Sequence, residues 1–322
     1  MNNYWKNYPD IESELESVKE YMLDSISDAI PIIKDPIENI IKAGGKMLRP
    51  AMVILGAKFG KYDAARIIPI AASIEFLHTA TLIHDDIIDE SKLRRGIESV
   101  QSKYSKDVAV LVGDYIFAKT FEILAGDYPA EMLKNLSKSI MSICKGELAQ
   151  YSYRYEGYSD IDQYIEIISG KTASLFSMSL FSGAYEGAVK NQTQQHLVKI
   201  GFAIGIMFQI IDDCLDYSSD SKLLGKNTIN DIKQGYITLP LFFAMQNDDS
   251  GELKKIVFSS DLDDNQISCV KSLVEKNNGV KFAKEKASEY FELANKSLKK
   301  LRKSKQKEVL EYIVDSMIKR TY

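Results

Sequence analysis

Apolar residues recur at three- and four-residue steps along most of the chain, which is the spacing of one face of an α-helix. In the stretch 67–89, for example, Ile70, Ile74 and Leu77 follow one face before a group of carboxylates. The stretch 196–216 repeats this arrangement and also ends in carboxylates. Asn-Gly and Asp-Gly hairpin signals are few. We therefore predict an all-α fold.

Clusters of Gly, Pro, Asn, Asp and Ser interrupt the helical pattern. They are found at Gly44-Gly45, Arg95-Gly96, 126–129, 156–160, 218–239 and 246–251. None is a long low-complexity linker, and the apolar periods continue across them with similar composition. We predict a single domain over residues 1–322 with roughly ten or more helices, and a split near residue 220 is the alternative.

Composition narrows the class of protein. The chain has 322 residues, 45% apolar and 27% charged, with a net charge of −4, which excludes a disordered or fibrous chain. Three cysteines at wide spacing fit neither a disulfide framework nor a thiolate metal site, and three histidines are too few for a histidine-rich one, so we expect a cytoplasmic setting. The polar, acidic N-terminal stretch predicts no secretory signal. The uncharged stretches 172–185 and 200–211 are too short to span a bilayer.

Two aspartate triplets follow the two apolar stretches, each with members at positions i, i+1 and i+4. The first triplet is Asp85, Asp86 and Asp89, and the second triplet is Asp212, Asp213 and Asp216. Side chains at i and i+4 are neighbours on a helix, so each triplet brings like charges together at a cost of about 0.2–0.5 kcal/mol per pair. Both also stand at the negative end of a helix dipole. A positive partner is therefore needed.

Hard divalent cations with oxygen ligands would remove this repulsion. Mg²⁺ typically takes one or two carboxylates and leaves room for waters or substrate phosphates. A single triplet is more simply a solvated acidic helix end, because so short a motif has many chance matches. Two copies, each at the rim of an apolar run, favour cation binding instead. If the two helices face each other, the triplets form a cation-filled mouth.

Basic residues stand near the predicted helix ends and breaks, where they could meet an anion held by such cations. They are Lys46, Arg49, Arg94, Arg95, Lys171 and Lys226. Arginine recognises phosphate in a bidentate manner and lysine supplies a point charge. Taken singly, each of these residues is an ordinary surface charge. Only its placement near a triplet makes it a candidate for binding an anion. The GGK at 44–46 is not a P-loop, because the GxxxxGK[ST] spacing is absent and no strand precedes it, so a P-loop kinase is disfavoured.

The series of motifs resembles that of the trans-type polyprenyl diphosphate synthases, and the likeness covers nearly the whole chain. The stretches that carry it are GGKMLRP, IEFLHTATLIHDDIID, RRG, GDYIFAKTF, GELAQ, GKTASLF, FQIIDDCLD and LGKNTINDIKQGYITLP. The resemblance implies an all-α bundle around a deep apolar cavity, usually in a homodimer. It also implies Mg²⁺-dependent, head-to-tail condensation of isopentenyl diphosphate onto an allylic diphosphate.

The resemblance assigns roles to residues at matching positions. The ligands of about three Mg²⁺ ions would be Asp85, Asp89, Asp212, Asp213 and Asp216, with Asp86 in support. The allylic diphosphate would be held by Arg94 and Lys171, and Lys226 would add a substrate contact. The isopentenyl diphosphate pocket would be formed by Lys46, Arg49, His78 and Arg95. Thr172 and Gln209 would turn their dipoles toward the developing carbocation.

The physical chemistry agrees with these roles. Breaking the allylic C–O bond leaves diphosphate and an allylic cation, so metal ions and a basic clamp stabilise the leaving group and no protein nucleophile is required. An apolar cavity keeps water from the cation until isopentenyl diphosphate attacks it. We expect the released diphosphate to take the final proton.

One position departs from the family pattern. Many members have a lysine after the glycine of the DIKQG stretch, and this chain has Tyr236. One phosphate contact is then missing or replaced by a hydroxyl, which puts substrate affinity in doubt. Such variation also resembles the large subunits of two-component synthases, which allows a separate small partner.

The residues before the first triplet bear on product length. A helix rises about 5.4 Å per turn, so Thr81, Ala80 and Leu77 line successive depths below the diphosphate, with Ile74 deeper still. Farnesyl-making relatives carry an aromatic residue at the first two depths, where this chain has small ones. We predict a product of six or more isoprene units, and the alternative is a geranylgeranyl or farnesyl product. The small residues could instead serve only to let another helix pack closely.

Other functions fit less well. A class I terpene cyclase typically has one aspartate-rich cluster and a different second metal motif, and a non-catalytic partner characteristically loses carboxylates or clamp residues.

Seven of the twelve residues 296–307 are basic, which is usual for a solvated helix face; a weaker idea is transient contact with an anionic membrane surface. We expect no nucleic-acid partner.

Overall fold

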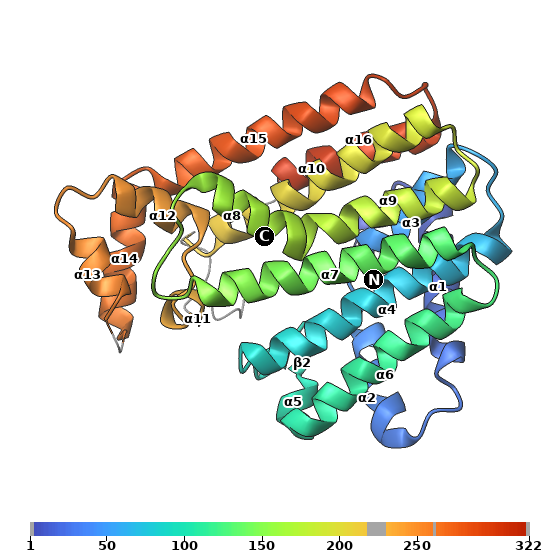
Figure 1. Ribbon diagram of the computed structural model, residues 1–322, viewed down its shortest axis with the longest axis horizontal. Helices are drawn as coiled ribbons and strands as arrows, with labels where there is room; N and C mark the ends of the chain where they lie inside the picture. Colours follow the sequence, from blue (N-terminus) through green and yellow to red (C-terminus); the bar gives the residue numbers. More distant parts are fainter. Residues whose placement is uncertain (1–2, 218–229, 260–261, 320–322) are drawn as a thin grey trace. The chain divides into compact units, whose positions relative to one another are not determined.

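The computed structural model describes residues 3–217, 230–259 and 262–319, which are helical almost throughout (Figure 1). This confirms the predicted all-α fold. Within the described residues, strands are limited to a hairpin of β1 (Leu93–Arg94) and β2 (Ile97–Glu98). The turn residues Arg95 and Gly96 both have positive φ, as a type I′ hairpin turn requires, which explains the break expected there.

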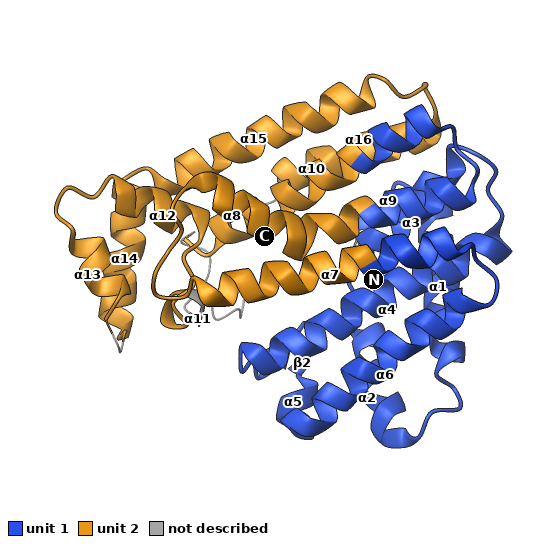
Figure 2. Ribbon diagram, in the orientation of Figure 1, with its two compact units in different colours: residues 1–137, 178–198 blue, residues 138–177, 199–322 orange. Residues whose placement is uncertain are grey.

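The chain separates into two compact units, coloured in Figure 2. Unit 1 is formed by residues 1–137 and 178–198, and unit 2 by residues 138–177 and 199–322. The boundaries fall inside three helices, none of them near residue 220: α7 (Ala130–Ser152), α9 (Ser174–Glu186) and α10 (Asn191–Leu215). The single domain over residues 1–322 stays a prediction.

Unit 1 is built around helix α4 (Ala64–Ile88), which packs against four other helices of the unit. The further elements of unit 1, apart from the hairpin, are η1 (Asn3–Trp5), α1 (Pro9–Ser25), α2 (Pro31–Ala43), α3 (Leu48–Lys58), α5 (Val100–Lys103) and α6 (Lys106–Ala125). The side chain of Asp63 caps α4 by accepting a hydrogen bond from the amide of Ala65 at 3.0 Å. The first triplet lies where this helix ends.

Helix α4 is buried on nearly all sides between Ile67 and Ala80, as expected of a core helix. Within the described part of the chain it is also the one helix long and apolar enough, by length and composition, to cross a membrane. Of that apolar window, 67% is buried inside the protein, which is the property of a core helix.

Unit 2 holds the second triplet where α10 ends at Leu215. Its other elements are α8 (Ile161–Ile168), the π-helical turn η2 (Ser169–Ala173), α11 (Asn230–Lys233), α12 (Leu239–Gln246), α13 (Glu252–Val257), α14 (Asp264–Lys276), α15 (Gly279–Leu298) and α16 (Lys305–Ile318). One hydrophobic cluster joins α8, α10, α12 and α14, and it includes the fully enclosed ring of Tyr164. The hydroxyl of Tyr164 donates from this cluster to Asp213 of the second triplet.

Candidate active site

The first triplet divides into one buried and two accessible carboxylates. Asp86 is 3% exposed, while Asp85 and Asp89 are half-buried. The guanidinium of Arg94, on strand β1, donates from Nε to Oδ1 of Asp86 at 2.9 Å and also from Nη2 to the same oxygen. Burial raises the pKa of Asp86, and the hydrogen bond and charge of Arg94 oppose that rise. The hairpin therefore holds the middle carboxylate, while the outer two stay half-buried.

The structure brings together three of the four residues predicted to bind isopentenyl diphosphate. Nη1 of Arg49 lies 3.1 Å from Nε2 of His78. Nη1 of Arg95 donates to the carbonyl of Gly44 at 2.5 Å. The pKa of Arg49 is lowered to about 10, and burial is the main cause. The charge of Glu75 opposes this shift, and the charge of Arg95 adds to it. These arginines make a concentration of positive charge in unit 1 that suits an anion.

His78 stays neutral in this surrounding. Burial, and then the charges of Arg49 and its neighbouring arginines, hold the pKa of His78 well below its usual value. A neutral imidazole can donate or accept a hydrogen bond without adding a further charge. The fourth predicted residue, Lys46, is turned toward Tyr4, with Nζ 5.1 Å from the ring centroid.

Glu75 is a buried acidic residue that sequence reasoning missed. It is 7% exposed, and burial raises its pKa while the charges of Arg95 and Arg49 lower it. Its signal in the sequence is a lone carboxylate within the apolar run of α4. It supplies a counter-charge to the two arginines.

The predicted chain-length residues occupy the part of α4 that precedes the first triplet. Leu77 and Ala80 are fully enclosed, and Thr81 is half-buried. Oγ1 of Thr81 donates to the carbonyl of His78 at 2.8 Å, so its polar atom is turned back onto its own helix. Small or aliphatic groups therefore stand at each of these depths.

The second triplet repeats the exposure pattern of the first. Asp213 is 7% exposed, whereas Asp212 and Asp216 are half-buried. Oδ2 of Asp213 accepts a hydrogen bond from the hydroxyl of Tyr164 at 2.7 Å, and Oδ1 accepts one from Nε2 of Gln209 at 2.9 Å. The role of Asp213 as a metal ligand stays a prediction.

Thr172 and Lys171 stand on the π-helical turn between α8 and α9. Oγ1 of Thr172 donates to Oε1 of Gln209 at 2.8 Å, so the two residues predicted to face the carbocation are in contact. Nζ of Lys171 lies 2.9 Å from Oε2 of Glu147 and 2.8 Å from Oε1 of Gln150, both on α7. Sequence reasoning quoted the GELAQ motif but did not assign these two partners.

Close backbone contacts position the π-helical turn. A Cβ on Gly146 of α7 would lie 2.6 Å from the amide nitrogen of Lys171, and a Cβ on Gly170 would lie 2.6 Å from the carbonyl oxygen of Ser142. On the other side, a Cβ on Gly205 of α10 would lie 2.4 Å from Cα of Ala173. Glycines thus let α7 and α10 approach the turn, and π-helical turns are frequent at functional sites.

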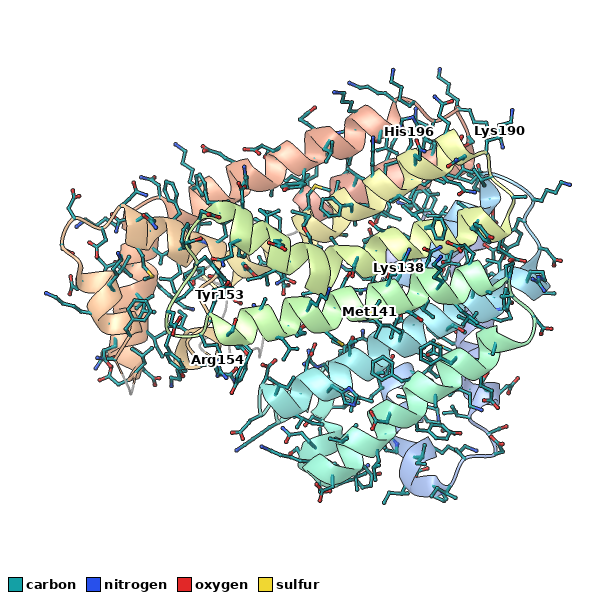
Figure 3. All side chains as sticks on the ribbon, viewed as in Figure 1. Lys138, Met141, Tyr153, Arg154, Lys190 and His196 are labelled. Carbon is teal, nitrogen blue, oxygen red and sulfur yellow. The ribbon has the colours of Figure 1, made fainter. Side chains whose placement is uncertain are left out.

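Tyr236, the departure from the family pattern, packs against a cation. Cζ of Arg154 lies 4.8 Å from the Tyr236 ring centroid, and its Nε donates to the carbonyl of Gln234 at 2.7 Å. The rings of Tyr151 and Tyr155 also flank this guanidinium, at 5.2 and 5.8 Å. Arg154 lies just past the end of α7 (Figure 3). The loop that lacks the lysine therefore has a guanidinium beside it.

Not every predicted position can be placed. Lys226 lies outside the described residues. Over residues 3–217, 230–259 and 262–319, no group of three or more His, Cys, Asp or Glu side chains is arranged to hold a metal ion. Each triplet nevertheless presents two half-buried carboxylates, and hard oxygen donors in this small number suit Mg²⁺, which takes further ligands from water and phosphate. The donor chemistry fits the predicted metal.

The fold and these paired acidic and basic groups define an all-α enzyme of diphosphate chemistry. A family model described as polyprenyl synthetase matches residues 30–276. The chain is 34% identical, over 93% of each chain, to an all-trans-nonaprenyl-diphosphate synthase (geranyl-diphosphate specific) from Rhodobacter capsulatus. It is 28% identical to the heptaprenyl diphosphate synthase component 2 of Bacillus subtilis, over 98% of this chain and 90% of that one. The chain belongs to the polyprenyl synthetase family.

Solved structures agree. A geranylgeranyl pyrophosphate synthase from Lactobacillus brevis matches with a TM-score of 0.92 and 31% identity, over 98% of this chain and 99% of that one. A polyprenyl synthase from Caulobacter crescentus, complexed with calcium and isoprenyl diphosphate, matches with a TM-score of 0.90 and 30% identity, over 96% and 95%. These comparisons confirm the fold class and the predicted activity: the chain is a prenyltransferase that makes polyprenyl diphosphates.

Proposed function

We propose that this prenyltransferase condenses isopentenyl diphosphate head-to-tail onto an allylic diphosphate with the help of about three Mg²⁺ ions. The observation that carries the proposal is the repeated exposure pattern of the triplets. In each, the middle carboxylate is buried and bonded to protein groups, and the outer two stay half-buried. Two pairs of half-buried carboxylates can thereby be reached by cations.

In this proposal Asp85, Asp89, Asp212 and Asp216 would hold the metal ions, and bound Mg²⁺ would supply positive charge to offset that of the leaving diphosphate. Arg94 and Lys171 bind phosphate oxygens of the allylic substrate through charge-assisted hydrogen bonds. Both are now paired with carboxylates of the protein, Asp86 and Glu147, so a phosphate would compete with or join those contacts.

The second substrate is assigned to the positive cluster of unit 1. Arg49 and Arg95 would bind the isopentenyl diphosphate anion, and neutral His78 would add a hydrogen bond. The terminal double bond then attacks the allylic cation, a new C–C bond forms, and a proton leaves the intermediate. We assign this proton to the released diphosphate.

We propose a product of six or more isoprene units. Support comes from the small, enclosed Ala80 and half-buried Thr81, and from relatives named nonaprenyl and heptaprenyl diphosphate synthases. The test is chain-length analysis of the product made from labelled isopentenyl diphosphate and farnesyl diphosphate with Mg²⁺. A product mainly of farnesyl or geranylgeranyl length would contradict the proposal.

A matched pair of variants locates the determinant of chain length. Ala80→Phe should shorten the product, because a ring placed there blocks the growing chain. Ala80→Val adds less volume and serves as the control, with a smaller shift. If Ala80→Phe is folded and active but makes the wild-type product, Ala80 does not line the path of the chain.

We further propose that the protein acts as a homodimer, or with a small partner subunit. Exposed apolar side chains support a protein partner: Val110 and Leu111 of α6 in unit 1 are 42% and 65% exposed, and Met141 and Leu148 of α7 in unit 2 are 55% and 68% exposed. Met141 is labelled in Figure 3. The relative named component 2 supports the second form. Light scattering after size exclusion, with activity measured on the purified chain alone, separates the two: a monomer without activity favours the small partner.

A cytoplasmic enzyme with a long apolar product would also meet a membrane surface, and we propose that the turn between α15 and α16 takes part. Lys299, Lys300, Arg302 and Lys303 are exposed there. Each basic residue near an anionic surface contributes about 1 kcal/mol. Sedimentation with vesicles should show binding that rises with anionic lipid content, and binding indifferent to that content contradicts the idea.

A further inference from the structure

A chain of hydrogen bonds links four side chains of unit 2. It runs from Tyr164 on α8 to Asp213 and Gln209 on α10, and from there to Thr172 on the π-helical turn, with steps of 2.7, 2.9 and 2.8 Å. Tyr164, Asp213 and Thr172 are buried, and Gln209 is half-buried. These bonds are therefore shielded from competition with water.

The chemistry of the groups sets the direction of every bond in this chain. An ionised carboxylate only accepts, so Asp213 requires a hydrogen from both the phenol of Tyr164 and the amide of Gln209. The amide nitrogen of Gln209 must then face Asp213, and its oxygen must face Thr172. The hydroxyl of Thr172 donates its hydrogen to that oxygen. The lone pairs of Thr172 Oγ1 that remain are available to whatever lies next to it.

This direction matters for the reaction. An oxygen that has turned its hydrogen away presents the negative end of its dipole, which stabilises a developing positive charge. If the amide of Gln209 were reversed, its nitrogen would donate to Thr172, and the hydroxyl hydrogen would be free to point outward. The sign of the dipole at Thr172 would then oppose a cation.

Tyr164 is well placed to keep the amide of Gln209 in one orientation. Its ring is 2% exposed and meets the ring of Tyr158 edge-on at 5.8 Å, and Tyr158 packs against Phe242 at 6.1 Å. The hydroxyl of Tyr164 is thus fixed by the hydrophobic core of unit 2. It gives the buried carboxylate of Asp213 a rigid donor from a different helix.

We propose that Tyr164 is a positioning residue for prenyl transfer: through Asp213 and Gln209 it fixes the direction of the Thr172 hydroxyl toward the allylic cation. The inference rests on the proposed function, because it needs the cation to form beside Thr172. Tyr164 itself touches neither substrate nor metal in this scheme.

The test compares Tyr164→Phe with Tyr153→Phe in the purified full chain. Tyr153 belongs to the same aromatic cluster, with its ring 5.9 Å from that of Tyr158, and is labelled in Figure 3, so it is the matched control for loss of a hydroxyl. We expect Tyr164→Phe to lower kcat about tenfold, the loss that follows from one buried hydrogen bond to a charged group. KM for both diphosphates and the product length should stay unchanged, and Tyr153→Phe should behave as wild type.

A double-mutant cycle tests the route of the effect. If Tyr164 acts through Gln209 on Thr172, then Tyr164→Phe should lower kcat much less in a Thr172→Val background than in the wild type. Losses that multiply would mean that Tyr164 acts independently of Thr172, and this would overturn the proposal. An unchanged kcat in Tyr164→Phe would overturn it as well.

Two further measurements keep these outcomes distinct. Mn²⁺ binding, followed by electron paramagnetic resonance with inorganic diphosphate, should be the same in Tyr164→Phe and wild type; weaker binding would mean that Tyr164 serves the metal site instead. If Tyr164→Phe does not fold, as judged by circular dichroism, Asp213→Asn takes its place, with the same expected kcat loss and with unchanged Mn²⁺ binding; weaker Mn²⁺ binding in Asp213→Asn would mean that Asp213 serves the metal site and would overturn the proposal. A wild-type chain without prenyl transfer would refute the proposed function, whereas an active wild type with an unaffected Tyr164→Phe refutes only this inference.

Discussion

The first and second triplets share their spacing and exposure pattern, but their buried members are held differently. Asp86 is bonded to a guanidinium, that of Arg94, eight residues later in the chain. Asp213 is bonded to the neutral phenol of Tyr164 and the neutral amide of Gln209. A carboxylate can thus be buried against an opposite charge or against dipoles, since either can supply hydrogen-bond donors to it.

The difference places a charge beside one buried carboxylate and dipoles beside the other. The three carboxylates of the first triplet are offset in part by Arg94, whereas the groups bonded to Asp213 bring no charge. The second triplet meets a cation at its outer member instead, because the charge of Asp216 opposes the burial that lowers the pKa of Lys271. It also stands at a helix end where the dipole is negative, as the first does.

The largest effect expected from this comparison concerns the outer carboxylates. Asp85→Asn and Asp212→Asn should each lower kcat by about 10²–10³-fold or more, because metal ions supply several kcal/mol of charge stabilisation. Steady-state kinetics at several Mg²⁺ concentrations measure this, and added Mg²⁺ should recover part of the loss. Equal losses in Asp86→Asn, with stability unchanged, would contradict the division into inner and outer carboxylates.

The second effect concerns stability at the first triplet, where Asp86 is paired with the charge of Arg94. Arg94→Gln should lower the free energy of unfolding by about 3 kcal/mol, since it leaves a buried carboxylate without its cation; the value is at the low end because Arg94 is 29% exposed. Urea unfolding measures it. The double variant Asp86→Asn/Arg94→Gln should be more stable than Arg94→Gln alone. If it is not, the pair does not behave as a buried ion pair.

The third effect concerns stability at the second triplet, where Asp213 is bonded to neutral groups. Tyr164→Phe should lower the free energy of unfolding by about 1–2 kcal/mol, because the hydrogen bond from its hydroxyl to Asp213 is lost while the bond from Gln209 remains. The same urea experiment applies, with Tyr153→Phe beside it. A loss as large as that of Arg94→Gln would remove the contrast between charge and dipole.

The fourth effect appears in the pH dependence of unit 1. Burial and the neighbouring arginines hold the pKa of His78 well below its usual value. Below about pH 6.5 the unfolded chain binds a proton that the folded protein excludes, so stability present at higher pH is lost as pH falls, by up to about 1.4 kcal/mol per unit. His78→Gln should reduce this slope in unfolding measurements between pH 5 and 7.5.

The pH dependence of stability expected from Glu75 has the opposite sign to that expected from His78. Burial raises its pKa, so it contributes stability at low pH that is lost as pH rises through its folded-state pKa. Glu75→Gln should therefore leave the fall in stability toward low pH steeper than in wild type. A change in the same direction as that of His78→Gln would show that the sign assigned to one of the two groups is wrong.

The smallest effect uses a cysteine next to the second triplet. Cys214 is 3% exposed, and burial raises the pKa of its thiol to about 12, whereas Cys144 is exposed. A thiol reagent at pH 8 should modify Cys144 within minutes and leave Cys214 unreacted until the protein unfolds. Mass spectrometry of the labelled protein identifies the sites. Fast labelling of Cys214 would mean that the buried side of the second triplet opens readily.

Much of this protein could be predicted from local pattern. The helical period over 67–89 and 196–216 anticipated α4 and α10 to within a few residues, because burial of an apolar face is written in the residues themselves. The matched triplets, and the basic residues near them, named most of the candidate site. The family resemblance named Thr172 and Gln209 as separate polar groups of the site, and the hydrogen bond between them is seen only in the structure.

The tertiary structure decided how those residues are partnered. Tyr164 and Asp213 are 49 residues apart, and Arg154 and Gln234 are 80 apart, so no local period reports that they meet. The π-helical turn that carries Thr172 likewise depends on glycines of α7 and α10 that permit close backbone contact. The period of apolar residues indicates which side of a helix avoids water. It does not indicate which distant donor will bond a buried carboxylate. That choice depends on packing, because hydrogen bonds act over about 3 Å and only the folded chain brings such groups that close.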